Sequence, residues 1–342
     1  MTVATDDTTV GTRDEQTTES TVQRSQIQQF WRQYKKNRLS TFGGAIIGAV
    51  LIVALLAPVL APHDPTVQFD SPPEKYHPMP PGSEIILTND GEIQQRSTAI
   101  LGTDHVGRDL LSRIIFGVRT TLIIAISVVL AAMVIGTALG GLAGYFRDSW
   151  IDETIMRVMD IIFPFPSLIL AIALLGAIGI GETTYQFAVL GSVTIPNILK
   201  MILVVTIVYI PRFARVMRGA TIREMEEDYV DALKSLGAGD ISILVRDVTV
   251  NSIQPVVIQG TLYMGTAVLV SAGLSFLGLG VQPPKPGLGV MLSNARGYIY
   301  SGEWWFATFP GVMIVIIILG FNLLGDGLRD ALDPKYETRG EG

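Results

Sequence analysis

Long uncharged stretches alternate with short charged ones along most of the chain. Five stretches contain more than 20 consecutive residues without a charged or histidine side chain, the longest between Asp247 and Lys285. About 20 apolar residues in a helix cross the hydrocarbon core of a bilayer, which is roughly 30 Å thick. A sixth stretch, between Glu182 and Arg212, is interrupted only by Lys200. The pattern predicts six membrane helices near residues 41–61, 120–145, 156–180, 196–216, 255–280 and 304–326.

Two of these predicted helices contain sequence features that change the picture locally. Residues 184–199 are either the start of the fourth helix or a separate re-entrant piece, and we expect Lys200 to reach the membrane interface from a helix end. In the third helix, Pro164 and Pro166 predict a kink. Asp160 lies near one end of that helix, three residues after Arg157. We expect either an interfacial pair of these two residues or an Asp160 that lines a pathway or sets the helix against a partner.

Glycines spaced four residues apart predict close contacts between helices. Gly44 and Gly48 lie in the first predicted span, and Gly136, Gly140 and Gly144 lie in the second. Small residues at this spacing let helix backbones approach closely in lipid. The pattern therefore favours a packed bundle over isolated anchors.

The distribution of lysine and arginine sets an expected orientation. If the N-terminus is cytoplasmic, the inside segments hold 16 of these residues, with Arg13 of the far tail left uncounted, and the outside segments hold 8. Such an excess on the cytoplasmic side is typical of multi-pass proteins of the plasma membrane. We therefore expect both termini inside. The expected segments are a disordered cytoplasmic tail (1–28), an amphipathic segment with the first membrane helix (29–62), an external loop (63–118), the membrane core (119–330) with a cytoplasmic loop at 212–251, and a second cytoplasmic tail (331–342).

Composition supports the membrane assignment and excludes several classes of function. The chain has 342 residues, 49% of them hydrophobic and only 16% charged, and its mean hydropathy is +0.43. Membrane lipid is thus an expected partner. A net charge of −6 disfavours a nucleic-acid partner. The absence of cysteine excludes disulfides, thiolate metal sites and a thiol nucleophile.

The predicted external loop contains all the histidines of the chain. His63, His77 and His105 are scattered without a close pair, so we expect no metal site. The first half of the loop is rich in proline, which predicts an extended, irregular segment.

The most informative polar stretch is the predicted cytoplasmic loop, residues 212–251. Apolar residues recur there with helical spacing, at Ile222, Met225, Tyr229, Leu233 and Leu236. Next, Gly237 is suited to a left-handed helix cap, and Asp240 is placed to cap a second helix over 241–250. The prediction is a helix, a tight turn and a second helix.

Three interpretations of this helix–turn–helix compete. Residues 221–247 carry 7 acidic and 3 basic side chains, which argues against binding of DNA. A plain connecting loop is a second interpretation, although long loops with helices of their own are usually functional. The third is a docking element for another protein.

The same stretch resembles the EAA loop of binding-protein-dependent ABC importer permeases, whose pattern is Glu-Ala-Ala, three residues, then Gly. The matching residues are Asp231, Ala232, Leu233, Lys234, Ser235, Leu236 and Gly237. Further stretches resemble the second permease subunit of the dipeptide, oligopeptide and nickel importers: 57–65, 101–113, 140–145, 160 with 165–167, and 273–280. The chain departs from the pattern at Asp231, Leu233 and Val250, and residues 67–98 and 184–195 look like insertions.

The resemblance implies an all-α fold with six membrane helices, of the type I importer permease kind, with a coupling helix in the cytoplasmic loop. The residues implied to couple to an ATPase are Asp231, Ala232, Leu233, Lys234, Ser235, Leu236, Gly237 and Ala238. The implied partners are a homologous second permease subunit, two cytoplasmic ATPase subunits and an extracellular solute-binding protein. Peptides are the implied substrate, with nickel or oligosaccharides as alternatives, and Asp160, Pro164 and Pro166 are candidates for a pathway or gate.

The chain also lacks motifs that would let it act alone. It has no GxxxxGK[ST] sequence, so we expect ATP to be bound by the partner subunits and no cofactor on this chain. It has no HExxH or GxSxG sequence, so we expect no enzyme activity. The alternative is an ion-gradient transporter or channel, which would need ionisable residues in the middle of the membrane. Only Lys200 and Asp160 come near that requirement.

Overall fold

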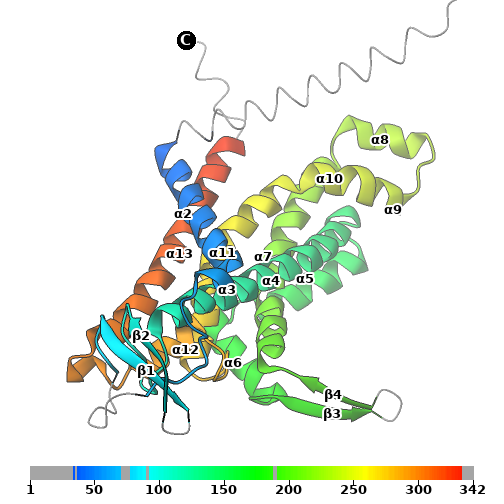
Figure 1. The fold of residues 1–342 in the computed structure, drawn as a ribbon. Coiled ribbons are helices and arrows are strands. Elements are labelled where there is room, and N and C mark those ends of the chain that lie inside the picture. Colours follow the sequence, from blue (N-terminus) through cyan, green and yellow to red (C-terminus); the bar gives the residue numbers. More distant parts are fainter. Residues whose placement is uncertain (1–33, 35–36, 71–77, 90–91, 188–190, 333–342) are drawn as a thin grey trace, which may run out of the picture.

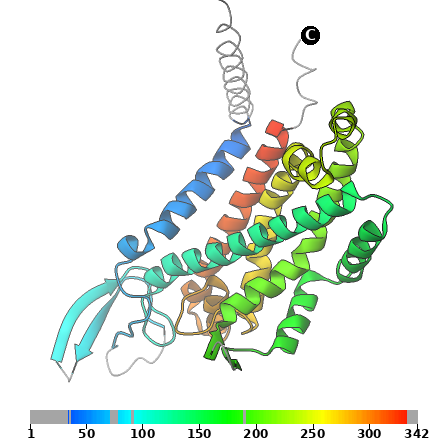
Figure 2. The ribbon, with the colours of Figure 1, turned by 90° about the vertical axis from the view of Figure 1, so that its right-hand side faces the viewer.

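The computed structural model describes residue 34 and residues 37–70, 78–89, 92–187 and 191–332. Five of the described helices are long and apolar enough to cross a membrane, and a sharply bent pair of shorter helices makes a sixth span (Figures 1 and 2). The spans are α2 (Arg38–Leu55), α4 (Leu110–Tyr145), the pair α5 (Trp150–Ile162) and α6 (Ser167–Ile178), α7 (Asn197–Glu224), α11 (Gln254–Phe276) and α13 (Trp304–Leu332). The predicted six-span helical architecture is confirmed. The tail 1–28 and His77 lie outside the described residues.

The first span begins at a clear capping signal. The side chain of Asn37 accepts hydrogen bonds from the backbone of Leu39 and Ser40, which fixes the start of α2 at Arg38. The helix was expected to continue to residue 61, but it stops at Leu55 and a short helix, α3 (Ala57–Leu60), follows. The proline in the first turn of α3 lacks a backbone N–H, so the helix breaks before it.

Helix α4 begins at Leu110 rather than near residue 120. Its N-cap is Asp109, whose carboxylate accepts a hydrogen bond from the backbone of Ser112. The hydropathy pattern places the charged Arg113 outside the membrane helix. In the structure Arg113 lies in the first turn of α4, and its side chain is buried. This guanidinium lies 3.2 Å from the carboxylate of Asp104 and donates to the carbonyl of Pro65. The long helix therefore includes residues that were expected to lie in the external loop.

The third predicted helix is broken rather than kinked. Helices α5 and α6 meet at an angle of 95°, and the residues between them include Pro164 and Pro166. Each proline lacks the backbone N–H that a continuing helix would need as a hydrogen-bond donor. Two prolines so close together end one helix and start another in a new direction.

Of residues 184–199, only 197–199 belong to the start of the fourth helix, as one of the two expectations had it. Most of the others lie in a β-hairpin of β3 (Thr183–Phe187) and β4 (Gly191–Ile195), and α7 begins directly after it. Lys200 does not reach an open interface, because it is only 2% exposed. Its ammonium group donates to the carbonyls of Gly179 and Gly181 and to the hydroxyl of Thr183. The lysine therefore joins the end of α6 to the base of the hairpin.

A second hairpin gives the predicted external loop more order than its prolines suggest. Strands β1 (Ser83–Asn89) and β2 (Glu92–Ala99) pair antiparallel. A small apolar core stabilises them, made of Phe69, Met79, Ile85 and Ala99. Both hairpins lie at the same end of the bundle as α12 (Leu288–Ala295) (Figure 1).

Glycines allow α4 and α7 to pack closely, as the spacing predicted. A side chain at Gly136 would meet Cβ of Phe213 at 2.5 Å, and one at Gly140 would overlap the carbonyl of Ala214. The predicted close contact at Gly48 in the first span is wrong, because a side chain there would have no neighbour within 4 Å. In the first span it is Gly43 that faces α13, against Leu323.

The two ends of the bundle differ in character. The first residues of α2, the last residues of α13 and a helical projection around α8 lie at one end, and the two hairpins with α12 lie at the other (Figure 1). We call these the projection end and the hairpin end.

Candidate functional site

The projection is formed by the predicted helix–turn–helix. It contains α8 (Asp228–Ser235), α9 (Asp240–Ser242), a π-helix, η1 (Ile243–Val248), and α10 (Thr249–Ser252). We call residues 224–252 the coupling segment. It extends beyond the end of α7 (Figure 1). Its buried apolar residues are Val230, Ile243, Leu244 and Val248, and Leu142 and Tyr145 of α4 pack against them.

The turn between the two arms is tight because Gly237 adopts the predicted left-handed conformation, with φ of 83°. The backbone N–H groups of Gly237 and Ala238 donate to the carbonyls of Lys234 and Leu233. These bonds satisfy carbonyls at the end of α8 that would otherwise lack a partner. Sequence reasoning placed this turn correctly.

The predicted coupling residues are brought together at the tip of the projection. Leu233 and Ala238 pack against the small core, whereas the rest of the set is exposed: Asp231, Ala232, Lys234, Ser235, Leu236 and Gly237. Leu236 does not continue the apolar stripe of the helix and is 84% exposed, because the chain turns at this residue. Ile241 is 73% exposed. The tip thus presents two large apolar side chains to its surroundings.

Asp240 has a different contact from the one expected of it. The N-cap of α9 is Gly239, and the carboxylate of Asp240 accepts a hydrogen bond of 2.8 Å from the hydroxyl of Tyr145, at the end of α4. The first arm is tied to the same region, because Arg147 lies 3.4 Å from Glu226. Both arms of the coupling segment are therefore attached to the turn after α4.

The two arms are also tied to each other. The hydroxyl of Tyr229 donates to Glu224 at 2.7 Å and accepts from the side-chain amide of Asn251 at 3.1 Å. Burial and the hydrogen bond to Glu224 raise the pKa of Tyr229 above its ordinary value. These two hydrogen bonds join the end of α7, α8 and α10 at the base of the coupling segment.

The second predicted site surrounds the break between α5 and α6. Pro164 and Pro166 lie in the break, and Asp160 lies in the last turn of α5. Asp160 does not pair with Arg157. It accepts a hydrogen bond of 2.7 Å from Arg215 of α7, whereas Arg157 pairs with Glu153 at 2.5 Å within α5. The i,i+4 partner of Arg157 was overlooked.

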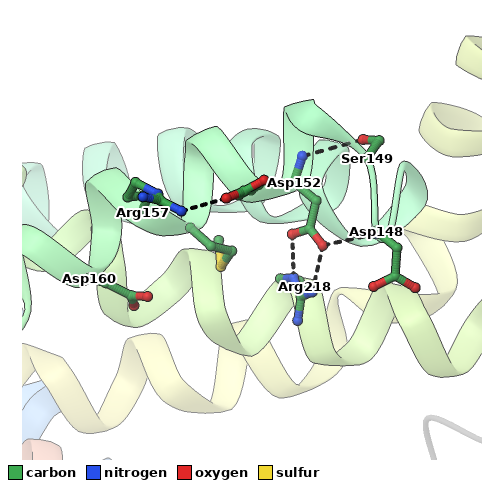
Figure 3. Close-up of a pocket in the computed structure, with 8 residues that line it drawn as sticks. Asp148, Ser149, Asp152, Arg157, Asp160 and Arg218 are labelled. Carbon is green, nitrogen blue, oxygen red and sulfur yellow. Dashed lines mark hydrogen bonds and ion pairs between the residues drawn. The ribbon is translucent and has the colours of Figure 1, made fainter.

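Sequence reasoning also missed a strong contact at the start of α5. The Nε and Nη2 groups of Arg218 each donate to one carboxylate oxygen of Asp152 at 2.6 Å, and the carboxylate side chain is 7% exposed (Figure 3). These residues lie beside a polar pocket of about 590 Å³ between α5 and α7. The sequence signal for this contact is the regular spacing of Arg212, Arg215 and Arg218 along one helix.

The hairpin end holds a buried ionic cluster built from the stretch 101–113. Asp104 lies 2.7 Å from Arg108 and 3.2 Å from Arg113, and all three side chains are at most 6% exposed. Among the described residues, no group of three histidine, aspartate or glutamate side chains is arranged to hold a metal ion. The ion pairs and the hydrogen bond from Arg113 to the carbonyl of Pro65 pack this stretch at the start of α4.

The comparisons with known proteins agree with this architecture. Residues 136–338 match the family model described as the binding-protein-dependent transport system inner membrane component, and residues 25–81 match the N-terminal membrane domain of oligopeptide transport permease C. In Pseudomonas aeruginosa, a di/tripeptide transport system permease is 37% identical over 93% of this chain and 95% of its own length. A glutathione transport system permease from Pectobacterium atrosepticum is 36% identical over 92% and 93%.

A solved structure shares the fold. It is a chain of the MetNI methionine ABC transporter in an inward-facing crystal form, with a TM-score of 0.50, 20% identity, and coverage of 66% of this chain and 98% of that one. The family match spans more than half of the chain, and the relatives match nearly all of it. The chain therefore belongs to the binding-protein-dependent transport system inner membrane components, the permease subunits of ABC importers.

Proposed function

We propose that this permease subunit imports short peptides across the plasma membrane, driven by ATPase subunits that dock on the coupling segment. The observation that carries the proposal is the shape of that segment, a helix–turn–helix that projects from the bundle with Leu236 and Ile241 exposed at its tip. Exposed large apolar groups next to a tight turn suit insertion into a cleft of a partner protein.

The charges of α8 indicate which kind of partner surface would complement it. Asp228 and Asp231 lie in the first turn of α8, and Asp231 is 83% exposed. A cleft with an apolar floor and a basic rim would complement this arrangement and would set the register of docking. Two ATPase subunits would bind one such segment each, on this chain and on a homologous second permease subunit. Nucleotide would be bound by the ATPase subunits alone.

The proposed orientation places the projection end in the cytoplasm. The described ends of α2 and α13 lie at that end, which agrees with the excess of lysine and arginine expected for inside segments. The hairpin end would then face outward, where a solute-binding protein delivers the substrate. The two hairpins, whose sequences look like insertions, lie at this end, so the docking of the binding protein would involve surfaces specific to this chain.

Peptides are proposed as the substrate because the relatives are named for them. Their names cite dipeptides, di- and tripeptides, and the tripeptide-like glutathione. Nickel or oligosaccharides are the runner-up substrates.

The experiment is uptake by sealed vesicles that contain the purified transporter of all subunits. With binding protein and labelled dipeptide outside and ATP inside, we expect uptake that stops when ATP is replaced by a non-hydrolysable analogue. Uptake driven by a proton or sodium gradient without ATP would contradict the proposal and would favour a gradient-driven transporter. The same vesicles compare peptide, nickel and oligosaccharide substrates.

A further inference from the structure

Three arginines of α7 contact the broken span on both sides of its break. They are spaced three residues apart, so they lie along one side of the helix. The arginine nearest the projection end contacts the first turn of α5. The middle one contacts the last turn of α5, and the third contacts the start of α6. The contacts are Arg218 with Asp152, Arg215 with Asp160, and Arg212 with Ser167. We call them the three rungs.

The first rung is the most firmly held. Arg218 binds both carboxylate oxygens of Asp152 at 2.6 Å, and the carboxylate is 7% exposed (Figure 3). The backbone N–H of Asp148 also donates to this carboxylate, at 3.2 Å. Separating this pair would leave a buried charge without a partner, which is strongly unfavourable. The first rung therefore stays closed while other contacts change.

The second rung is built differently. The side chains of Asp160 and Arg215 are 65% and 35% exposed, and a single hydrogen bond of 2.7 Å joins them. An ion pair this exposed contributes little net stability, because water solvates both groups when they separate. The same guanidinium lies 3.7 Å from the centre of the Phe163 ring, the first residue of the break. One arginine thus holds the end of α5 and the first residue of the break.

The third rung reaches across the break. Arg212 donates to the hydroxyl of Ser167, the first residue of α6, at 2.7 Å. The guanidinium also lies over the rings of Tyr209 and Tyr263, at 4.9 and 5.3 Å. Because Pro164 and Pro166 interrupt the helical hydrogen bonds between α5 and α6, the rungs supply polar contacts that join both helices to α7, on both sides of the break.

Helix α7 connects this ladder to the coupling segment. It runs from Asn197 to Glu224 and carries all three rungs, and the coupling segment follows it directly. A movement of the segment is therefore passed to α7 and, through the rungs, to the break.

We infer that Arg215 is a positioning residue that sets the angle of the α5–α6 break during transport. The bidentate pair of Arg218 and Asp152 is the fixed pivot, and the exposed pair of Arg215 and Asp160 opens and closes as α5 turns about it. This inference rests on the proposed function, since the motion that drives it is the docking and closure of the ATPases.

The test measures the break directly in the complete transporter. Because the chain has no cysteine, spin labels at Thr154→Cys in α5 and Ala177→Cys in α6 report the distance between the two helices. Both positions are exposed. Distances are recorded without nucleotide and with ATP trapped in the ATPase dimer, and uptake and ATP hydrolysis are measured on the same samples.

The variants separate the rung from general effects of charge. Arg215→Gln and Asp160→Asn each remove the second rung, and the double exchange Arg215→Asp with Asp160→Arg restores it with reversed charges. The matched control is Glu153→Gln, which removes an ion pair within α5 whose side chains are 69% and 71% exposed. If Arg215→Gln fails to assemble with its partners, Asp160→Asn is used for the test, because Asp160 is the more exposed residue of the pair.

We expect the nucleotide-dependent distance change to disappear in Arg215→Gln and Asp160→Asn. Uptake should fall by about tenfold while ATP hydrolysis continues, the size of a typical coupling between two sites. The exchanged pair should regain most of the distance change and most of the uptake, and Glu153→Gln should behave as the parent.

An unchanged distance shift and uptake in Arg215→Gln would overturn the inference. A parent transporter that imports with ATP but shows no change between the labels overturns the inference alone. A parent that imports nothing with ATP contradicts the proposed function as well, and the inference falls with it.

Discussion

The hydroxyl of Tyr145, the last residue of α4, donates a hydrogen bond of 2.8 Å to the carboxylate of Asp240 in the coupling segment. The two residues are far apart in the sequence, and the contact attaches the second arm of the segment to the longest membrane helix. The first arm is attached to the adjoining turn by Arg147 and Glu226. The coupling segment is therefore connected to the bundle through the turn between α4 and α5 as well as through α7.

Removing the hydroxyl tests this attachment. In Tyr145→Phe we expect the local opening free energy of residues 238–242 to fall by about 1 kcal/mol, the usual contribution of one hydrogen bond. Hydrogen exchange of that stretch should become about fivefold faster. Asp240→Asn keeps an acceptor and should change the exchange much less. Equal exchange in Tyr145→Phe and the parent would show that the contact does not hold the arm.

The backbone of the turn gives a second prediction. Gly237 has φ of 83°, where a β-branched side chain is strained even though a side chain there would have no neighbour within 4 Å. Gly237→Val should cost about 1–3 kcal/mol at the turn, and transport should be lost while insertion and the distant bundle stay intact. Gly239 has φ of −73° and equally open surroundings, so Gly239→Ala should transport normally. The measurement is ATP-driven uptake at matched protein levels, and normal uptake by Gly237→Val would argue against coupling through this turn.

Packing between α4 and α7 supplies a third prediction. A methyl group at Gly140 would overlap the carbonyl of Ala214, so Gly140→Ala should destabilise the subunit by about 1–3 kcal/mol. Gly219 in α7 has nothing within 4 Å of a built side chain. Gly219→Ala should therefore be neutral or stabilise slightly, since alanine favours the helix. Thermal unfolding in detergent compares the two, and equal melting temperatures would contradict the close contact.

The sequence alone predicts the helical spans because the spacing of charges is set by the thickness of the bilayer. It also predicts the turn at Gly237, since few residues other than glycine adopt a positive φ readily. It fails where a tertiary contact hides a charge. Arg113 and Lys200 are buried with partners that are distant in the sequence, so their charges mark neither the end of α4 nor a membrane interface.

The partners of Asp160 and Arg157 show the same limit. Their spacing suggested a pair on one helix face, yet Asp160 pairs with Arg215 of another helix. No periodicity reveals which of two elements supplies a partner. The β1–β2 hairpin, too, packs on a few buried residues such as Phe69 and Ile85, which the proline-rich composition of the loop does not reveal.

His105 provides a prediction about pH at the hairpin end. The imidazole stacks on Phe306 at 5.9 Å, and burial lowers its pKa below the ordinary value of about 6.5, while Asp104 acts in the opposite sense. Protonation of His105 is therefore less favourable in the folded loop than in the unfolded loop. Its stability should be complete above about pH 6.5 and should decrease as the pH falls toward the lowered pKa of the folded state.

The measurement is hydrogen exchange of residues 101–110 at pH 7.5 and pH 5.5, corrected for the intrinsic effect of pH. We expect weaker protection at the lower pH. His105→Phe keeps the stacking and has no titrating group, so its protection should not depend on pH in this range. A dependence that persists in His105→Phe would assign the effect to another group.

The most direct test of the account is the identity of the protein that contacts the tip of the coupling segment. The chain has no cysteine, so Ala238→Cys introduces a single reactive site beside Gly237. Crosslinking in native membranes, followed by mass spectrometry, should attach an ATPase subunit, and the site should react only with reagents that reach the cytoplasm. A site that is labelled only from outside and attaches no ATPase would contradict the orientation and the coupling role together.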